Sequence, residues 1–287
     1  MLCLVGARGA DGRLIVLADL LQTTKLATGL RDGGLLDPDA RARTRTAVAT
    51  FAERARGLGA RPIVALGTAA LRAAADGPAF AQEIARATGV PVSILSGDDE
   101  ARLAYEAVAS ATEGALLAVD VGGRSTELVL GHGAHIEDAR SLPLGALALT
   151  EALVGDQPLG APLAEMRRHV EQVLAAHDLP ARARARGAKL IASGGTVTAL
   201  AALDLGLVTY DGDRVHGHML AADRLVTLAL AAPVGGRALD AGRRRILPAG
   251  AVVLEAVARA AGAAHVVVSD RGIRHARLLT LLPDGRA

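Results

Sequence analysis

The chain has 287 residues, of which 51% are hydrophobic and only 1% aromatic, and it contains no tryptophan. This length provides one large or two ordinary domains with an aliphatic core, and the scarcity of aromatic rings argues against single-stranded nucleic acid binding, which uses them as stacking platforms. The formal net charge is only +2, so the arginines either form solvated helix faces or gather around a polyanionic substrate.

The N-terminal region gives no sign of export. Cys3 is the only cysteine, which excludes an internal disulfide and favours a reducing compartment. The first residues, MLCLVGARGADGRL, lack the basic start and the apolar stretch of a signal peptide, and no run of about 18 apolar residues predicts a membrane span. We therefore expect a cytoplasmic protein without a membrane or nucleic-acid partner.

Strands and helices alternate in the first part of the chain. The pattern predicts strands at residues 2–5 and 14–17, joined by a hairpin turn at 6–12. A strand follows this turn, whereas a phosphate loop would open a helix. The remaining elements are helices at 37–58, 67–75, 80–88 and 98–111, and strands at 62–66 and 90–95. This order predicts a parallel or mixed sheet covered by helices.

A second α/β domain follows a soft boundary at residues 112–114. The pattern there predicts a β-hairpin, then helical segments, a strand leading into a glycine turn, two more helices, another strand and a final helix. The hairpin covers 115–121 and 126–131, and the helical segments cover 147–175. The strand before the glycine turn is 189–192, the later strand is 266–269 and the final helix is 272–282. We therefore expect domains at 1–114 and 115–287, with the final helix returning to pack on the first domain.

The stretch LAVDVGGRSTELV, residues 117–129, is the strongest local signal. A buried strand ends at Asp120, two glycines allow the backbone to bring N–H groups close to an anion, and Glu127 returns a second carboxylate on the next strand. Carboxylates beside a phosphate-binding turn suit a hydrated Mg²⁺, which prefers oxygen ligands and bridges to phosphate. An ordinary Asp-Gly hairpin is the alternative.

Three further turns carry residues of interest. In LIASGGTVTAL, residues 190–200, a glycine turn opens a helix, whose N-terminal amides favour an anion, although a purely structural turn has the same pattern. The stretch SGDDEARL, residues 96–103, begins a helix with acids that complement its dipole. In GTAALR, residues 67–72, Arg72 either pairs with phosphate or lies on the surface.

Taken in order along almost the whole chain, these motifs resemble the exopolyphosphatase and guanosine pentaphosphate phosphatase family of the actin-like ATPase superfamily. The resemblance also includes SLPLGAL, VHGHML, ILPAGAVVLEAV and VVVSDRGIRHARL. It implies an α/β fold of two actin-like, ribonuclease H-like domains with a cleft between them.

The resemblance also implies roles for individual residues. Glu100 matches the family's candidate general base, and Asp120 and Glu127 match the acids that hold Mg²⁺ or another divalent cation and its water. The positions that match phosphate-binding residues are Arg72, Gly122, Gly123, Ser125, Gly194, Gly195 and Thr196.

The chain departs from the family pattern at several positions. Leu2–Arg8 matches the strand after the family's first phosphate loop, and the loop itself is absent. Either the assigned start is misplaced, which the persisting site acids favour, or the loop is lost and the protein only binds its ligand. Arg124 stands where a third glycine is usual, and its charge suits an anion; Asp76 stands where Asn is usual. His216 and His218 form an H-x-H pair without an evident third ligand, which favours a structural role.

The leading hypothesis is metal-dependent hydrolysis of the terminal phosphate of inorganic polyphosphate by a homodimer. Two alternatives remain: hydrolysis of guanosine pentaphosphate (pppGpp), and a non-catalytic polyphosphate- or nucleotide-binding regulator. A kinase like the sugar kinases of the same superfamily is disfavoured, because no adenosine pocket is identifiable in the sequence.

Overall fold

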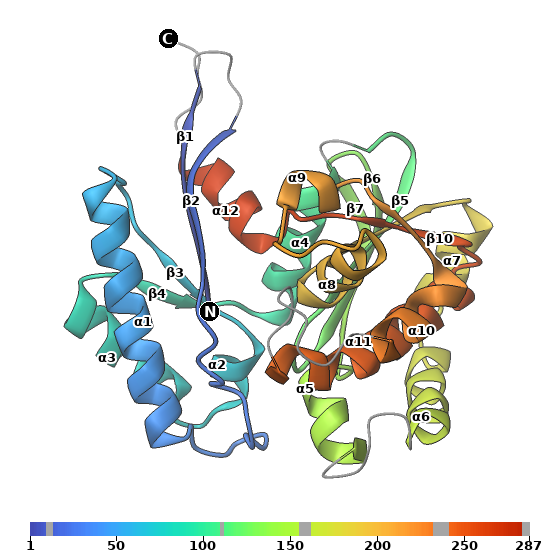
Figure 1. The fold of residues 1–287 in the computed structure, drawn as a ribbon, viewed down its shortest axis with the longest axis horizontal. Coiled ribbons are helices and arrows are strands. Elements are labelled where there is room, and N and C mark those ends of the chain that lie inside the picture. The colour runs from blue at the N-terminus through green and yellow to red at the C-terminus, as the bar shows by residue number, and fades with distance from the viewer. Residues whose placement is uncertain (10–13, 110–111, 155–161, 232–240, 283–287) are drawn as a thin grey trace. The chain divides into compact units, whose positions relative to one another are not determined.

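The computed structural model describes all residues except 10–13, 110–111, 155–161, 232–240 and 283–287. It contains two compact units, the first made of Met1–Asp99 with Ile273–Ala287 and the second of Glu100–Gly272 (Figure 1). In the part of the chain that is described, no helix combines the length and apolarity needed to cross a bilayer. The domain limits at 114 and 115 stay a prediction.

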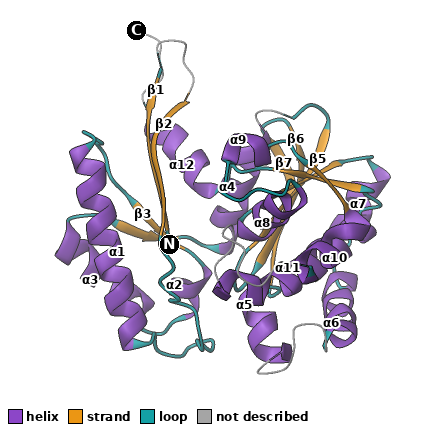
Figure 2. Ribbon diagram, viewed as in Figure 1, coloured by secondary structure: helices purple, strands orange, loops and turns teal. Residues whose placement is uncertain are grey.

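The first unit contains two small sheets (Figure 2). Strand β1 (Leu2–Arg8) pairs antiparallel with β2 (Leu14–Leu21), and β3 (Ala65–Gly67) pairs parallel with β4 (Val92–Ile94). The expected turn at 6–12 is wrong at its start, because β1 continues through Gly6 to Arg8. A Cβ on Gly6 would lie 2.9 Å from Leu278 Cδ2, so this glycine marks a close approach to the C-terminal helix rather than a turn.

The helices of the first unit begin where the sequence provides caps. The Asp37 carboxylate accepts a hydrogen bond of 2.7 Å from the Ala40 amide and starts α1. The Arg41 guanidinium then pairs with the carboxylates of Asp76 and Glu83 near α3, which explains the acid at position 76. The helices assigned wholly to this unit are α1 (Pro38–Gly57), α2 (Ala69–Ala73), α3 (Gly77–Thr88) and α12 (Ile273–Leu281).

A mixed sheet organises the second unit, with the strand order β7-β6-β5-β8-β10-β9. The central strands β5, β8 and β10 run parallel, and β6, β7 and β9 are antiparallel to their neighbours. Their bounds are Ala115–Val121 for β5, Thr126–His132 for β6, His135–Leu142 for β7, Lys189–Ser193 for β8, Met219–Ala221 for β9 and His265–Val268 for β10.

Aliphatic side chains fill the core of this unit, as the composition predicts. Leu117 and Leu128 of the sheet and Val252 and Leu254 of α11 are fully buried, and α11 packs against α5, α6, α8 and α10. The π-helical turn Thr150–Val154 follows α5 and precedes α6, so helical segments occupy the range 147–175 where the sequence predicted them; residues 155–161 of this range lie outside the described residues. The helices are α5 (Ala146–Leu149), α6 (Leu163–Ala175), α7 (Leu179–Ala185), α8 (Gly195–Asp204), α9 (Gly212–Val215), α10 (Leu225–Leu230) and α11 (Ala241–Ala260), and α4 (Gly97–Ala109) crosses from the first unit.

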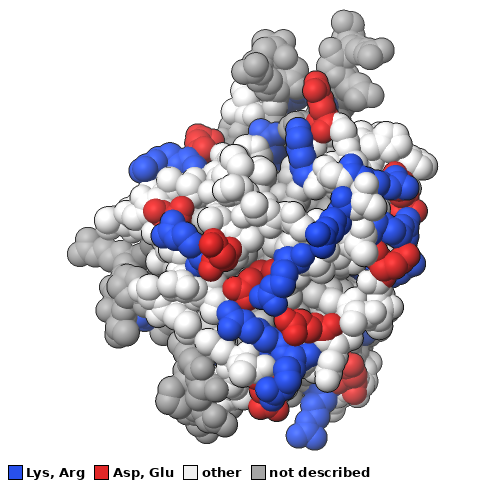
Figure 3. All heavy atoms as spheres, turned by 90° about the vertical axis from the view of Figure 1, so that its right-hand side faces the viewer, with Lys and Arg blue, Asp and Glu red and all other residues white. Residues whose placement is uncertain are grey.

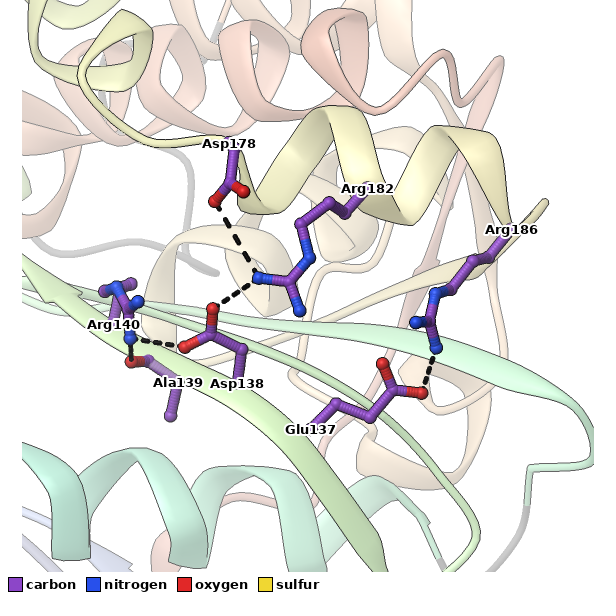
Figure 4. Close-up of polar contacts among 7 residues, drawn as sticks. All are labelled: Glu137, Asp138, Ala139, Arg140, Asp178, Arg182 and Arg186. Atoms are coloured by element: carbon purple, nitrogen blue, oxygen red, sulfur yellow. Dashed lines mark hydrogen bonds and ion pairs between the residues drawn. The ribbon is translucent and has the colours of Figure 1, made fainter.

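Ion pairs connect the arginine-rich helix α7 to the edge strand β7 (Figure 4). Arg182 Nη1 lies 2.6 Å from Asp138 Oδ2, and Arg186 pairs with Glu137. On the face shown in Figure 3, basic and acidic side chains are interleaved and do not form a patch of one sign. Arg182 and Arg186 therefore link α7 to the sheet and are not simply part of a solvated helix face.

We predict that Asp138→Asn lowers the free energy of unfolding by roughly 1 to 2 kcal/mol, because it removes the negative charge that Arg182 and Arg140 share and replaces one of the two acceptor oxygens with an amide donor. The Asp138 side chain is 12% exposed, so solvent screens this cluster less than a surface pair. Urea unfolding at neutral pH measures the change.

Asp178→Asn is the matched control, because Asp178 lies 3.8 Å from the same arginine but is 74% exposed. We expect the control to change stability by less than about 0.5 kcal/mol. Equal losses of unfolding free energy in the two variants would show that burial of the Asp138 cluster adds nothing to stability.

Candidate active site

Four neighbouring strands of the second unit bring polar side chains into one row. Asp120 on β5 is directly opposite Glu127 on β6 and Ser193 on β8, and Glu127 is opposite Ser141 on β7. Side chains of directly paired residues project from the same face of a sheet. The register therefore places two carboxylates side by side, with a serine at each end of the row.

Hydroxyl groups orient both carboxylates. Ser141 Oγ donates a hydrogen bond of 2.8 Å to Glu127 Oε1, and the Ser125 hydroxyl donates a second hydrogen bond to Glu127. The Ser193 hydroxyl donates to Asp120. Because a hydroxyl donor stabilises an ionised acceptor without neutralising its charge, these contacts fix the carboxylates while leaving the row acidic.

A third acid, Glu100 on α4, adds its charge to this row. Desolvation by burial raises the pKa of Asp120 to about 6, and repulsion from Glu100 contributes to the shift. Burial likewise raises the pKa of Glu127 to about 7, with further repulsion from Glu100 and Asp120. The three acids singled out in the sequence are therefore brought together within one unit; their catalytic role stays a proposal.

The first glycine turn follows Asp120 and is held by the segment that starts α5. The Gly122 amide donates to the Ser125 carbonyl, and the Gly122 and Gly123 carbonyls accept from amides of that segment, including Ala146. A Cβ on Gly145 would lie 2.2 Å from the Arg124 backbone. The glycine of the SLPLGAL stretch therefore permits this segment to pack directly under the turn.

The second glycine turn touches the carboxylate row. Gly194 has φ of +91°, and a Cβ there would lie 2.4 Å from Asp120 Oδ1, so only glycine fits between the turn and this carboxylate. Gly195 opens α8, whose N-terminal amides and dipole favour an anion. Thr196, which is buried, packs against Gly250 of α11. Both predicted turns thus adjoin the same end of the β5–β8 strand pair.

Arg243 is a site residue that the sequence analysis missed. Its Nη2 lies 3.6 Å from the position that a Cβ on Gly195 would occupy, which places a guanidinium beside the second turn. Guanidinium groups bind phosphate oxygens through paired N–H donors. The run of three arginines at 243–245, shortly before Pro248, was the signal available in the sequence.

Two other positions that the sequence singled out are on other elements. Arg72 belongs to the first unit, where its Nη1 donates a hydrogen bond of 2.9 Å to the Leu95 carbonyl; its phosphate contact stays a prediction. In the H-x-H pair, His218 Nε2 lies 2.8 Å from Asp204 Oδ2, and the other oxygen of this carboxylate, Oδ1, lies 3.0 Å from Arg224 Nη1. This histidine therefore takes part in a structural ion-pair cluster.

The described residues contain no group of three or more His, Cys, Asp or Glu side chains arranged to hold a metal ion. Mg²⁺ needs less from the protein, because it is usually bound by one or two carboxylates, with water and substrate phosphate completing its shell. Asp120 and Glu127 provide two neighbouring oxygen ligands whose raised pKa values show that their charge is poorly compensated. These residues fit such a cation.

Comparison with known proteins assigns the class. The Ppx/GppA phosphatase family model matches residues 5–284, and the chain belongs to this family. A guanosine-5'-triphosphate,3'-diphosphate pyrophosphatase of Vibrio vulnificus (strain YJ016) is 35% identical over 156 residues, which cover 54% of this chain and 31% of that protein. The matched region thus spans about a third of the length of that relative.

Solved structures agree with this assignment and confirm the predicted α/β, actin-like fold. The crystal structure of the Aquifex aeolicus Ppx/GppA family member has 26% sequence identity and a TM-score of 0.77, covering 94% of this chain and 90% of its own. An exopolyphosphatase from Cytophaga hutchinsonii has 18% identity and a TM-score of 0.85, covering 99% and 96%. The latter likeness concerns the fold alone.

We predict that the carboxylate row makes the protein less stable as pH rises. Asp and Glu side chains have unfolded-state pKa values near 4, below the folded values of about 6 and 7. The folded state therefore binds more protons, and stability falls between about pH 4 and pH 7, by an amount on the order of a few kcal/mol. Urea unfolding at several pH values, without divalent cations, measures this slope.

Glu127→Gln should flatten the profile between about pH 5 and pH 7, because the uncharged amide loses no proton. Glu113→Gln is the control, since Glu113 is exposed at the turn before β5. If the Glu127 variant keeps the native slope, this carboxylate does not carry the shifted titration.

Proposed function

We propose that this chain hydrolyses the terminal phosphoanhydride bond of inorganic polyphosphate with the help of Mg²⁺. The observation that supports this most is the grouping of Glu100, Asp120 and Glu127 beside two glycine turns in one unit. Membership of a phosphatase family narrows the reaction to phosphoryl transfer. The protein is expected to work in the cytoplasm as a homodimer.

The site has the parts that phosphoryl transfer to water requires, which are positioning and charge neutralisation. The terminal phosphate would rest on the amides of the two turns, around Gly123 and Gly195, with Arg124 and Arg243 neutralising its oxygens. Mg²⁺ bound by Asp120 and Glu127 would neutralise further phosphate charge. Arg72 of the first unit is proposed as an additional phosphate ligand.

Glu100 is proposed as the general base. Its carboxylate would accept a proton from the attacking water as the water oxygen bonds to the terminal phosphorus. The bond from phosphorus to the bridging oxygen then breaks, releasing orthophosphate and a chain shorter by one phosphate. The repulsion between Glu100 and the row acids indicates that these groups share one environment, which this role requires.

Guanosine pentaphosphate is the second candidate substrate, because the curated relative is named a guanosine-5'-triphosphate,3'-diphosphate pyrophosphatase. The same chemistry would remove its terminal phosphate and leave guanosine tetraphosphate. Both substrates contain the phosphoanhydride bond on which the carboxylate row would act, so the row does not distinguish them. The ratio of kcat/KM for the two substrates, measured on the native protein, decides between them.

We predict that Glu100→Gln lowers kcat for orthophosphate release by at least about a hundredfold, which is the usual contribution of a general base. The substitution keeps the shape of the side chain and removes its ability to accept a proton. Release of orthophosphate from polyphosphate with saturating Mg²⁺ measures kcat, and the same assay is run with pppGpp.

Glu106→Gln is the matched control, because Glu106 is exposed on the same helix. It should keep native kcat and KM. Unchanged activity in the Glu100 variant would contradict the assignment of the base. Tight binding of both substrates by the native protein without any orthophosphate release would remove the enzyme proposal and leave a binding regulator.

A further inference from the structure

Helix α11 contains two residues that disfavour a helix, and both are close to the second glycine turn. Pro248 lies inside the helix, Gly250 follows two residues later, and both are buried. In a helix interior, proline costs about 3 kcal/mol and glycine roughly 1 kcal/mol relative to alanine. The rest of the helix after Gly250, AVVLEAVARA, contains neither residue. Departures from local preference are expected where a functional site requires them.

Gly250 allows α11 to lie directly on the first turn of α8. A Cβ on this glycine would lie 2.4 Å from Thr196 Oγ1 and 2.7 Å from Thr196 Cγ2. Thr196 is 7% exposed and is the second residue of α8, so close packing leaves its side chain little room to move. A larger residue at position 250 must therefore displace α11 or Thr196.

Arg243 lies on the same face of α11 as Gly250. Seven residues separate the two, which is about two helical turns, and α11 packs against α8. Arg243 Nη2, Cζ and Nε lie 3.6, 3.8 and 4.0 Å from the position that a Cβ on Gly195 would occupy. The guanidinium thus packs over the residue before Thr196, and α11 contacts two consecutive residues of the turn.

Pro248 lies between these two contact points. Proline has no N–H to bond the carbonyl four residues earlier, which belongs to Arg244, and its ring crowds this carbonyl. Helices bend at such positions. The direction of the turn that carries Arg243 therefore depends on Pro248 and on the close approach of Gly250 to α8.

We propose that Pro248 and Gly250 are positioning residues that hold the Arg243 guanidinium against the second glycine turn. Neither is expected to contact phosphate itself. They set how far the guanidinium reaches across the turn, and a misplacement of about 1 Å is enough to weaken such a site. This inference rests on the proposed phosphate site, and it adds two residues outside the carboxylate row to those that determine substrate affinity.

A double-mutant cycle separates positioning from packing. Gly250→Ala should raise the dissociation constant of imidodiphosphate with Mg²⁺ at least about fivefold, measured by isothermal titration calorimetry. In an Arg243→Gln background, the same substitution should change this constant less than about twofold, because the group that it displaces is already gone. A purely structural role would give the same loss in both backgrounds, and that result would overturn the proposal.

Pro248→Ala tests the same helix without adding a clash. Alanine favours a helix, so this variant is expected to fold even where Gly250→Ala does not, and it should weaken imidodiphosphate binding only when Arg243 is present. Gly57→Ala is the control and should bind as the native protein does, because no neighbouring atom lies within 4 Å of its Cβ position at the end of α1. Circular dichroism shows which variants are folded. Native affinity in the folded variants at positions 248 and 250 would also overturn the proposal.

Turnover distinguishes this inference from the proposed reaction. If the native protein binds imidodiphosphate but releases no orthophosphate from polyphosphate or pppGpp, the hydrolase proposal falls and the cycle still supports the positioning role. If the native protein does not bind imidodiphosphate, both proposals are wrong.

Discussion

The pairing of Asp120 with Glu127 across β5 and β6 is the interaction on which the site depends. Glu127 is buried and Asp120 is half-buried, and the hydroxyls that hold them do not neutralise their charge. Desolvation raises the pKa of both carboxyls, and the charge of Asp120 raises that of Glu127 further. The folded chain keeps this unfavourable arrangement because the register of a well-packed sheet imposes it. Binding of a cation or a proton therefore stabilises the site, and a hydrolase that uses a metal ion needs this property.

The rest of the second unit brings anion-binding groups to this pair. The parallel β5–β8 pair ends at Asp120 and Ser193, so the turns that follow leave from the same edge. Glycine is required where the backbone comes closest, at Gly194 against Asp120 and at Gly145 against the Arg124 backbone. Each of these close approaches joins two segments that are distant in sequence. The motifs that are spread along the chain therefore converge in space.

Sequence patterns predicted the elements whose burial follows a simple rule. Strand β5 has the predicted limits because both of its faces are buried and it forms a continuous apolar run. Strand β7 was missed because HIEDARSL is mostly polar and lies at the edge of the sheet, where tertiary pairing overrides local propensity. Asp120 and Glu127 were identified from the local pattern of a strand, a glycine turn and a second strand, and the role of Glu100 only through the family resemblance. The approach of Arg243 to Gly195 joins two distant segments, so no local pattern predicts it.

The most direct test is a crystal structure with Mg²⁺ and imidodiphosphate, in which nitrogen replaces the bridging oxygen. It shows whether Asp120 and Glu127 bind the cation while the two glycine turns bind phosphate. We expect a cation about 2.1 Å from oxygens of Asp120 and Glu127. We also expect phosphate oxygens within hydrogen-bonding distance of amides in both glycine turns. A ligand bound elsewhere, or a carboxylate pair that remains without a cation while the phosphate is bound, would contradict this expectation.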